Sequence, residues 1–280
     1  MKTIRILGIV IILVLIFSLL AAANHMIAGP QGKEKTISNN YTLNDAQIAG
    51  INRVNINFQG NTSGIGVKFQ NKSENLYDIS IEREENSREP SVTYTRNGDV
   101  LDVNLLLDSG SASIALGNRC TYNTNLQTKV GGFGLYLDNN GKLDNVNTSI
   151  KYVGGGTVVL GNSTFNRMDL SVNLGGFAVQ VLPEKFSSTG TIHTNIQIGG
   201  VNLQIQPASN LGYQVKGTVD LGGLIFEPNN FNVLVNNTTN TVIESKDYSK
   251  KSSKLQIEST VGLGGVNINM FYMPLEMFPQ

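Results

Sequence analysis

The sequence predicts an all-β protein, a β-solenoid-like stack of repeats, and two observations lead to this fold class. The first is a phrase that recurs along the chain: an apolar alternation, a Gly-Gly pair and a second apolar alternation. The second is the spacing of the pairs, whose first glycines stand at 131, 154, 175, 199, 222 and 264, so that the first five lie 21–24 residues apart. Such a period, without helical periodicity between the copies, is typical of stacked β units that complete each other's cores. The alternative is an antiparallel β-sandwich in which the pairs mark turns.

The apolar positions change parity at each glycine pair. Leu170, Val172 and Leu174 are expected to face the core, as are Ile198 and Leu221 in later copies, whereas the apolar residues after each pair have the other parity. Because successive side chains on a strand face opposite sides, the backbone must absorb one residue at the glycines, as a β-bulge or a corner does. Glycine at a polar turn, such as position 190, is expected to tolerate alanine. The predicted structural glycines are Gly131, Gly132, Gly154, Gly155, Gly175, Gly176, Gly199, Gly200, Gly222, Gly223, Gly264 and Gly265.

The N-terminal segment Met1–Ile27 has the features of a membrane anchor or a signal peptide. Lys2 and Arg5 precede an uncharged apolar run that ends at Ala23 and is long enough to cross a bilayer. The three alanines at its end also suit signal cleavage. The basic residues place the amino end in the cytoplasm, so the bulk of the chain is expected outside, anchored to the membrane or secreted after cleavage.

The remaining chain divides into three regions by composition. Residues 28–50 are polar and are expected to form a tether. Residues 51–119 form an N-terminal β region, in which strict apolar alternation runs from Leu101 to Leu107. Residues 120–273 hold the glycine pairs and form the repeat domain, with a strand-like stretch at Asn240–Glu244 where a copy without glycines could stand. Whether the N-terminal β region is a separate domain stays open.

Charge and rare residues exclude several functional classes. Lys+Arg and Asp+Glu number 21 each, so no net charge attracts nucleic acid. Cys120 is the only cysteine, and no histidine stands near it in the chain, so it is expected to be a buried thiol rather than a nucleophile. The phrase GGFGLYLD at 131–138 lacks the aspartate of the calcium-binding nonapeptide at the required position. We therefore expect no catalytic, cofactor or metal site, and a protein that is not an enzyme.

Asparagine and glutamine fill many outward positions of the repeats. Stacked in register, their amides could hydrogen-bond from strand to strand; a sugar-binding face is the functional alternative, and the absence of tryptophan favours the ladder. The outward amides of the repeats are Asn173, Gln180, Asn195, Gln197, Asn202, Gln204, Gln206, Asn267 and Asn269. Candidate N-glycosylation sites in an exported chain are Asn40, Asn61, Asn71, Asn147, Asn162, Asn236 and Asn237.

The phrases DLSVNLGGFAVQVLP, TNIQIGGVNLQIQP and STVGLGGVNINM resemble the toast-rack and adhesin families, which include the exported C-terminal domain of LiaF-type envelope-stress proteins. The resemblance covers Val153–Met270 well and Ile51–Leu107 weakly. It implies an all-β, membrane-tethered or surface-exposed domain without catalytic residues. LiaF-type proteins usually place several membrane spans before this domain, whereas one candidate span precedes it here.

Two functions follow as hypotheses. The first is a membrane-tethered extracytoplasmic β-solenoid that acts as a structural, adhesin-like or interaction module of the cell envelope, with envelope proteins or glycans as partners besides the membrane. The alternative is a cell-envelope stress sensor or regulator domain that works through a membrane partner. A carbohydrate-active solenoid enzyme would need two carboxylates facing each other across a groove.

Overall fold

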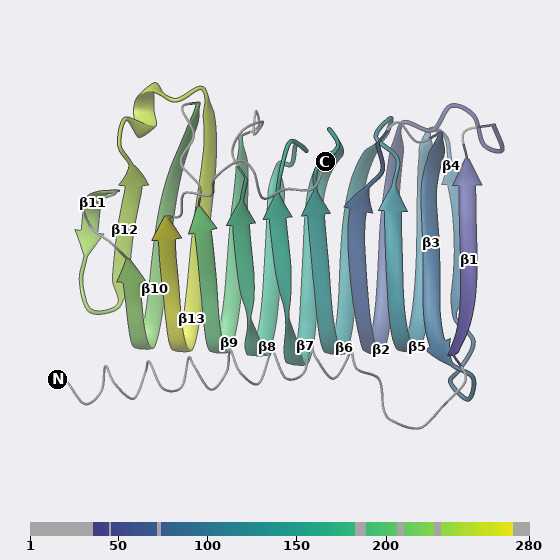
Figure 1. Ribbon diagram of the computed structural model, residues 1–280, viewed down its shortest axis with the longest axis horizontal. Coiled ribbons are helices and arrows are strands. Elements are labelled where there is room, and N and C mark those ends of the chain that lie inside the picture. Colours follow the sequence, from purple (N-terminus) through teal and green to yellow (C-terminus); the bar gives the residue numbers. More distant parts are fainter. Residues whose placement is uncertain are drawn as a thin grey trace, which may run out of the picture.

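The computed structural model describes residues 36–44, 46–71, 74–182, 189–205, 210–226 and 231–270. Within these ranges the all-β prediction is confirmed, because the strands join in one long sheet whose neighbours are mostly parallel (Figure 1). The segment Met1–Ile27, the predicted anchor or signal peptide, lies outside the described residues. In the part of the chain that the structure describes, no helix is both long and apolar enough to cross a membrane.

Thirteen strands and one short 3-10 turn make up the described chain. The turn covers Tyr248–Lys250. The strands are β1 (Thr36–Asn44), β2 (Arg53–Phe69), β3 (Asn75–Glu84), β4 (Ser91–Asn97), β5 (Val100–Leu116), β6 (Thr121–Leu137), β7 (Lys142–Leu160), β8 (Arg167–Val181), β9 (Gly190–Ile205), β10 (Leu211–Phe226), β11 (Phe231–Asn236), β12 (Asn240–Ser245) and β13 (Ser253–Met270).

Eight of these strands are long, with 15–19 residues each, and every one of them bends in the middle. Each runs down one side of the molecule, turns at the lower edge and runs up the other side (Figure 1). We call the part before the bend the first arm, the part after it the second arm, and the bend the corner. Apolar side chains from both arms, such as Val172 and Val179 of β8, are buried between them. Parallel bent strands of this kind differ from the antiparallel β-sandwich that the sequence left as an alternative.

The corners stack in register because their first glycines stand side by side. In all six pairs the first glycine has a positive φ, from 138° at Gly131 to 158° at Gly154. Register pairing joins Gly175 to Gly154 and Gly199, and the column continues through Gly264 to Gly222. A Cβ placed on Gly199 would overlap the main-chain oxygen of Gly175, and the same overlap recurs along the column. The corner therefore requires glycine both for its φ and for the close approach of the next strand.

The structure corrects the predicted burial of the residue directly before each pair. Leu174, Ile198 and Leu221 are 36%, 42% and 63% exposed, although their parity with the buried first-arm residues predicted a core position. The bend begins one residue earlier than the glycines, so these side chains turn outward at the corner. The change of parity thus occurs between Val172 and Phe177, both of which are buried.

The spatial order of the long strands differs from their order in the chain. The order is β5-β2-β6-β7-β8-β9-β13-β10, so β13 lies between β9 and β10 and pairs in parallel with both. The suggested extra copy at Asn240–Glu244 is wrong: β12 pairs antiparallel with β10 and β11. The reason is local, because Asn237 accepts hydrogen bonds from the main-chain nitrogens of Thr239 and Asn240 and closes a tight hairpin.

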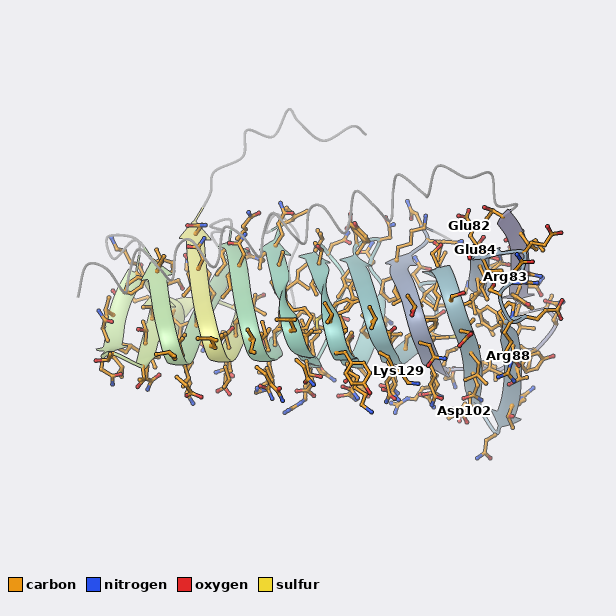
Figure 2. All side chains as sticks on the ribbon, turned by 90° about the horizontal axis from the view of Figure 1, so that it is seen from below. Glu82, Arg83, Glu84, Arg88, Asp102 and Lys129 are labelled. Atoms are coloured by element: carbon orange, nitrogen blue, oxygen red, sulfur yellow. The ribbon has the colours of Figure 1, made fainter. Side chains whose placement is uncertain are left out.

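Short antiparallel strands cap the N-terminal end of the stack. β3 pairs with the second arm of β5, β4 pairs with its first arm, and β1 pairs with β3. Charged side chains, among them Glu82 and Arg88, gather at this end (Figure 2). Residues 36–44 of the expected tether belong to β1, because Leu43 is buried in the core. β2 pairs with β6 along nearly its whole length, so the N-terminal β region and the repeat domain share one sheet.

Asp78 of β3 accepts several hydrogen bonds within this cap. We expect these bonds to make the stability of the protein depend on pH. Its carboxylate accepts hydrogen bonds from Gln70 Nε2 at 2.7 Å and from Asn75 Nδ2 at 2.9 Å. Partial burial raises the pKa of Asp78, but hydrogen bonds from Thr42, Asn75 and Gln70 outweigh it and leave the pKa below its usual value. The stabilisation is therefore complete above the unfolded pKa of about 3.9 and is lost as the pH falls through the lower folded pKa.

Replacing Asp78 with asparagine should lower the urea midpoint at neutral pH and reduce the further loss of stability in acid. Asparagine keeps the size of the side chain but cannot accept two bonds on each of two charged oxygens. The measurement is a series of urea denaturation curves from neutral pH down to pH ~3, below the unfolded pKa. Equal pH dependence in the parent and the variant would show that Asp78 does not link the cap to protonation.

Candidate functional site

The outer face of the first arms is polar and ordered in rows. Because the first arms are parallel and in register, equivalent residues of neighbouring strands stand side by side. Their chain neighbours point into the core, so the row side chains point outward. The upper row contains Asp102, Asn55, Asn123, Asn145 and Arg167, from β5 to β8. The lower row contains Asn104, Asn57, Asn125, Asn147, Asp169, His193, Glu258 and Lys216, from β5 to β10.

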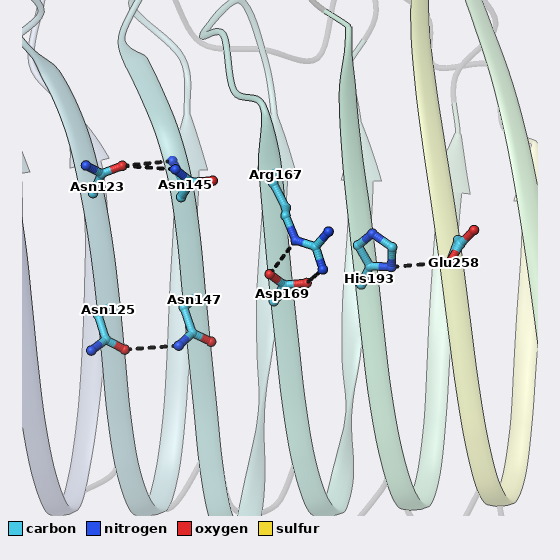
Figure 3. Close-up of polar contacts among 8 residues, drawn as sticks. All are labelled: Asn123, Asn125, Asn145, Asn147, Arg167, Asp169, His193 and Glu258. Atoms are coloured by element: carbon cyan, nitrogen blue, oxygen red, sulfur yellow. Dashed lines mark hydrogen bonds and ion pairs between the residues drawn. The ribbon is translucent and has the colours of Figure 1, made fainter.

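Amide hydrogen bonds connect the upper row from β7 to β5 and join two pairs of neighbours in the lower row. In the upper row Asn55 Nδ2 donates to Asp102 at 2.7 Å, Asn123 Nδ2 donates to Asn55 at 2.8 Å, and Asn145 Nδ2 donates to Asn123 at 3.4 Å. In the lower row Asn147 Nδ2 donates to Asn125 Oδ1 at 3.2 Å (Figure 3). The amides all donate in the direction of β5, so the upper row ends on a carboxylate that accepts without needing to donate.

Charged side chains replace the amides on β8, β9, β13 and β10. Arg167 donates to both carboxylate oxygens of Asp169, at 2.7 and 2.8 Å, and these bonds raise the pKa of Arg167. His193 Nδ1 lies 3.3 Å from Glu258 Oε2 (Figure 3). Together with Lys216 the lower row thus alternates in charge along the last four strands whenever His193 is protonated.

Two shallow depressions hollow this face. One, of about 280 Å³, lies over the amides of β2, β6 and β7 and reaches Asp102 of β5. The other, of about 370 Å³, lies over β8, β9 and β13 and is lined by Arg167, Asp169, His193 and Glu258 together with hydroxyls such as Ser171. Both are open to solvent, and apart from Leu170 the residues that line them are polar. The face therefore offers hydrogen-bond donors and acceptors rather than an apolar pocket.

The carboxylates of this face and the single thiol of the chain each have a partner. Asp169 and Glu258 stand on the strands that flank β9, and both are partly exposed and paired, the first with Arg167 and the second with His193. Cys120 is buried, and its thiol donates to the main-chain oxygen of Ile51 at 3.1 Å. Among the described residues, no group of three or more His, Cys, Asp or Glu side chains could hold a metal ion.

The structure places the residues named from the sequence in different parts of the molecule. Of the predicted outward amides, Asn267 Nδ2 donates to Asn202 Oδ1 at 3.3 Å on the second arms. Asp138 of the GGFGLYLD phrase closes a loop, since its main-chain oxygen accepts from Ser163 Oγ. Six of the candidate glycosylation asparagines are exposed and Asn162 is half-buried.

The amide rows of β2, β6 and β7 were not identified from the sequence. The signal for them is an Asn-x-Asn phrase at 55–57, 123–125 and 145–147. It ends six residues before the corner position on β2 and β6, and seven residues before it on β7, where the register shifts by one residue. The phrase precedes the glycine pairs, and one of its copies lies in the N-terminal region, which has no glycine pair. It is therefore not part of the repeat that the glycine pairs define.

Comparison with known proteins shows the fold. No protein-family model and no curated protein matches this sequence. The crystal structure of a proposed cell adhesion protein from Clostridium sporogenes is similar over 85% of this chain and 100% of its own, with 14% identity and a TM-score of 0.54. A proposed adhesin from Bacteroides fragilis aligns over 86% of this chain at 9% identity, but its TM-score of 0.29 is too low to show a shared fold. The relation to LiaF-type proteins remains a resemblance in sequence phrases.

Proposed function

We propose that this protein is an extracytoplasmic, adhesin-like interaction module of the cell envelope, held at the membrane by Met1–Ile27. The observation that carries this proposal is the outer face of the first arms, where rows of amides and paired charges stand on a rigid parallel sheet. The fold shared with the Clostridium sporogenes protein supports it, because cell adhesion is the role proposed for that protein.

The chemistry of the face points to a hydroxyl-rich ligand. An amide donates and accepts at once, as a hydroxyl does, so rows of amides can pair with sugar hydroxyls without a net charge. The rows repeat at the strand spacing of about 4.8 Å, which suits an extended polymer lying across the strands better than a compact small molecule. We therefore propose a glycan of the cell envelope, or of a neighbouring surface, as the ligand class.

Asn147 lies in the lower row over the first depression and provides the test. Asn147→Arg should weaken binding to purified envelope glycans at least tenfold, because the longer charged side chain fills the depression and breaks the bond to Asn125. The measurement is retention of the full chain on immobilised glycan, titrated with soluble glycan.

Thr157→Arg is the matched control, because Thr157 is exposed on the second arm of the same strand, between Gly134 and Ala178. It adds the same charge and size to the opposite outer face and should leave retention unchanged. Equal retention of both variants and the parent would contradict the proposed face. Recovery of a membrane protein with the chain, dependent on Met1–Ile27, would instead favour the sensor alternative.

A further inference from the structure

An apolar ridge runs along the corner edge of the stack. On each of six adjacent strands, the residue directly before the first glycine is aliphatic and exposed by 36–63%. We call this set the corner ridge. From β6 to β10 in spatial order it consists of Val130, Val153, Leu174, Ile198, Leu263 and Leu221.

Register pairing makes the corner ridge continuous. Val153 pairs with Val130 and Leu174, and Ile198 pairs with Leu174 and Leu263. Five strand spacings of about 4.8 Å give a length of about 24 Å. The column of glycines follows directly in the chain, so the ridge side chains stand beside bare backbone. Figure 2 views this edge from below, where the ribbons cross from one arm to the other.

The corner itself does not require apolar side chains. On β2 and β5, Thr62 and Ser109 occupy the position equivalent to Val130. Single exposed apolar residues are ordinary on a protein surface, whereas exposed apolar residues that run together often mark contact with a protein or a membrane. Six aliphatic side chains in consecutive strands therefore indicate a surface that is covered in use.

The entry point of the chain brings the corner edge within reach of a bilayer that holds Met1–Ile27. Thr36, the first described residue, pairs with Glu84, and the neighbouring Glu82 pairs with Ser111, which follows the corner glycine Gly110 of β5. The described chain thus begins at the corner edge (Figure 1). Only residues 24–35 separate it from the apolar run that ends at Ala23, and 12 residues span at most about 40 Å.

Size and charge also favour a bilayer over a second copy of the chain. The corner ridge is one side chain wide and about 24 Å long. Its area is therefore far smaller than the roughly 800 Å² per partner that a stable dimer buries. Lys129 directly precedes Val130 and Lys151 stands two residues before Val153; both are exposed and can reach anionic lipid headgroups, and they outnumber the one exposed carboxylate that directly precedes a ridge residue, Asp220. Lys151 also lies 5.2 Å from the ring of the exposed Tyr152, a residue type enriched at membrane interfaces.

We propose that the corner ridge rests on the outer surface of the lipid bilayer, with its aliphatic side chains among the headgroups, so that the strands stand upright on the membrane. This inference rests on the membrane tether of the proposed function. It would hold both polar outer faces perpendicular to the membrane and accessible from the sides.

The test uses the full chain in vesicles of phosphatidylcholine and phosphatidylglycerol in equal parts. Cys120→Ser removes the buried thiol, and Ile198→Cys carries an environment-sensitive fluorophore. Nitroxide lipids labelled near the headgroup should quench this fluorophore on the order of fivefold more than the same label at Gln204→Cys, because interfacial contact places the ridge within about 5–10 Å of the headgroups. Gln204 lies on the second arm of the same strand, away from the corner.

A second variant tests whether the apolar character is needed. With the fluorophore at Leu174→Cys, the changes Ile198→Asp and Leu263→Asp should abolish the additional quenching, while an unchanged urea midpoint shows that the sheet is intact.

The possible outcomes distinguish the contact of the corner ridge with the bilayer from the membrane tether of the proposed function. Quenching at Ile198→Cys but not at Gln204→Cys supports the inference. A chain that floats with the vesicles but keeps a water-exposed, unquenched label overturns the ridge contact and leaves the tether standing. A label shielded from water yet unquenched by lipid assigns the ridge to a protein contact and also overturns it. A chain that does not float with vesicles overturns the tether, and the inference with it.

Discussion

Gly199→Ala should destabilise the protein by about 3 kcal/mol or more, although it adds a single methyl group. Gly199 has a φ of 142°, which other residues reach only with strain. Its Cβ would also overlap the main-chain oxygen of Gly175, which cannot move without shifting the neighbouring corner. Strain and overlap add, so the effect should exceed that of either alone. The measurement is the urea midpoint of the variant and the parent, with equal m-values showing that the same surface unfolds.

Gly223→Ala is the control, because Gly223 is a second glycine of a pair, does not have a positive φ and has open space where its Cβ would lie. Its midpoint should correspond to a change within about 0.5 kcal/mol. Gly190→Ala is not a suitable control, although the sequence led us to expect that position 190 tolerates alanine. Gly190 is buried, and its Cβ would lie 2.5 Å from the ring of Phe165. Stability of Gly199→Ala equal to the parent would refute the role of the glycine column.

Phe133→Ala should lower the free energy of unfolding by about 3–5 kcal/mol, the usual loss for a large aromatic core residue. Phe133 is buried on the second arm of β6, and Gly156 of β7 separates it from Phe177 of β8 in the same row. The two rings meet over this glycine, with centroids 5.4 Å apart. The third glycine of the VGGGTVVL phrase therefore makes room for a pair of rings from the strands on either side.

The interaction between these positions can be isolated by a double-mutant cycle. Gly156→Ala alone should destabilise, because its Cβ would lie 2.5 Å from the Phe133 ring. Phe133→Leu replaces the ring with a smaller side chain and leaves room for the Cβ at position 156. In that background Gly156→Ala should reduce the free energy of unfolding by less than it does alone. Strictly additive effects in chemical denaturation would show that the glycine does not serve the ring pair.

The amide rows show how far local patterns reach. The alternation in Asn55–Asn57 and Asn123–Asn125 indicates outward amides on a strand, and this much is visible in the chain. Which amides meet is a different question, because it depends on β2 lying beside β6 rather than on nearness in sequence. The site was therefore present in the sequence as separate phrases and became one face only when the strands paired.

The exposure of the corner ridge shows the opposite case, in which a local rule was applied one residue too far. Period-two alternation correctly buries Leu170 and Val172, but Leu174 stands where the strand has already begun to bend and faces solvent. The position of a bend within one residue depends on where the neighbouring backbones make contact, which alternation does not report.

By itself, the sequence determined the all-β class and the six glycine pairs at which the strands change parity, because apolar alternation and the conformational freedom of glycine act within a few residues of chain. That these positions are corners rather than bulges was decided by the tertiary structure (Figure 1). Only the tertiary structure decided the order of the strands, with β13 inserted between β9 and β10, the antiparallel place of β12 and the outward turn of Leu174 and Ile198. The physical reason is the repeat itself: strands with the same phrase present nearly equivalent hydrogen-bonding edges and the same glycine corner. Local sequence therefore cannot distinguish one neighbour from another, and the choice falls to the packing of the whole stack.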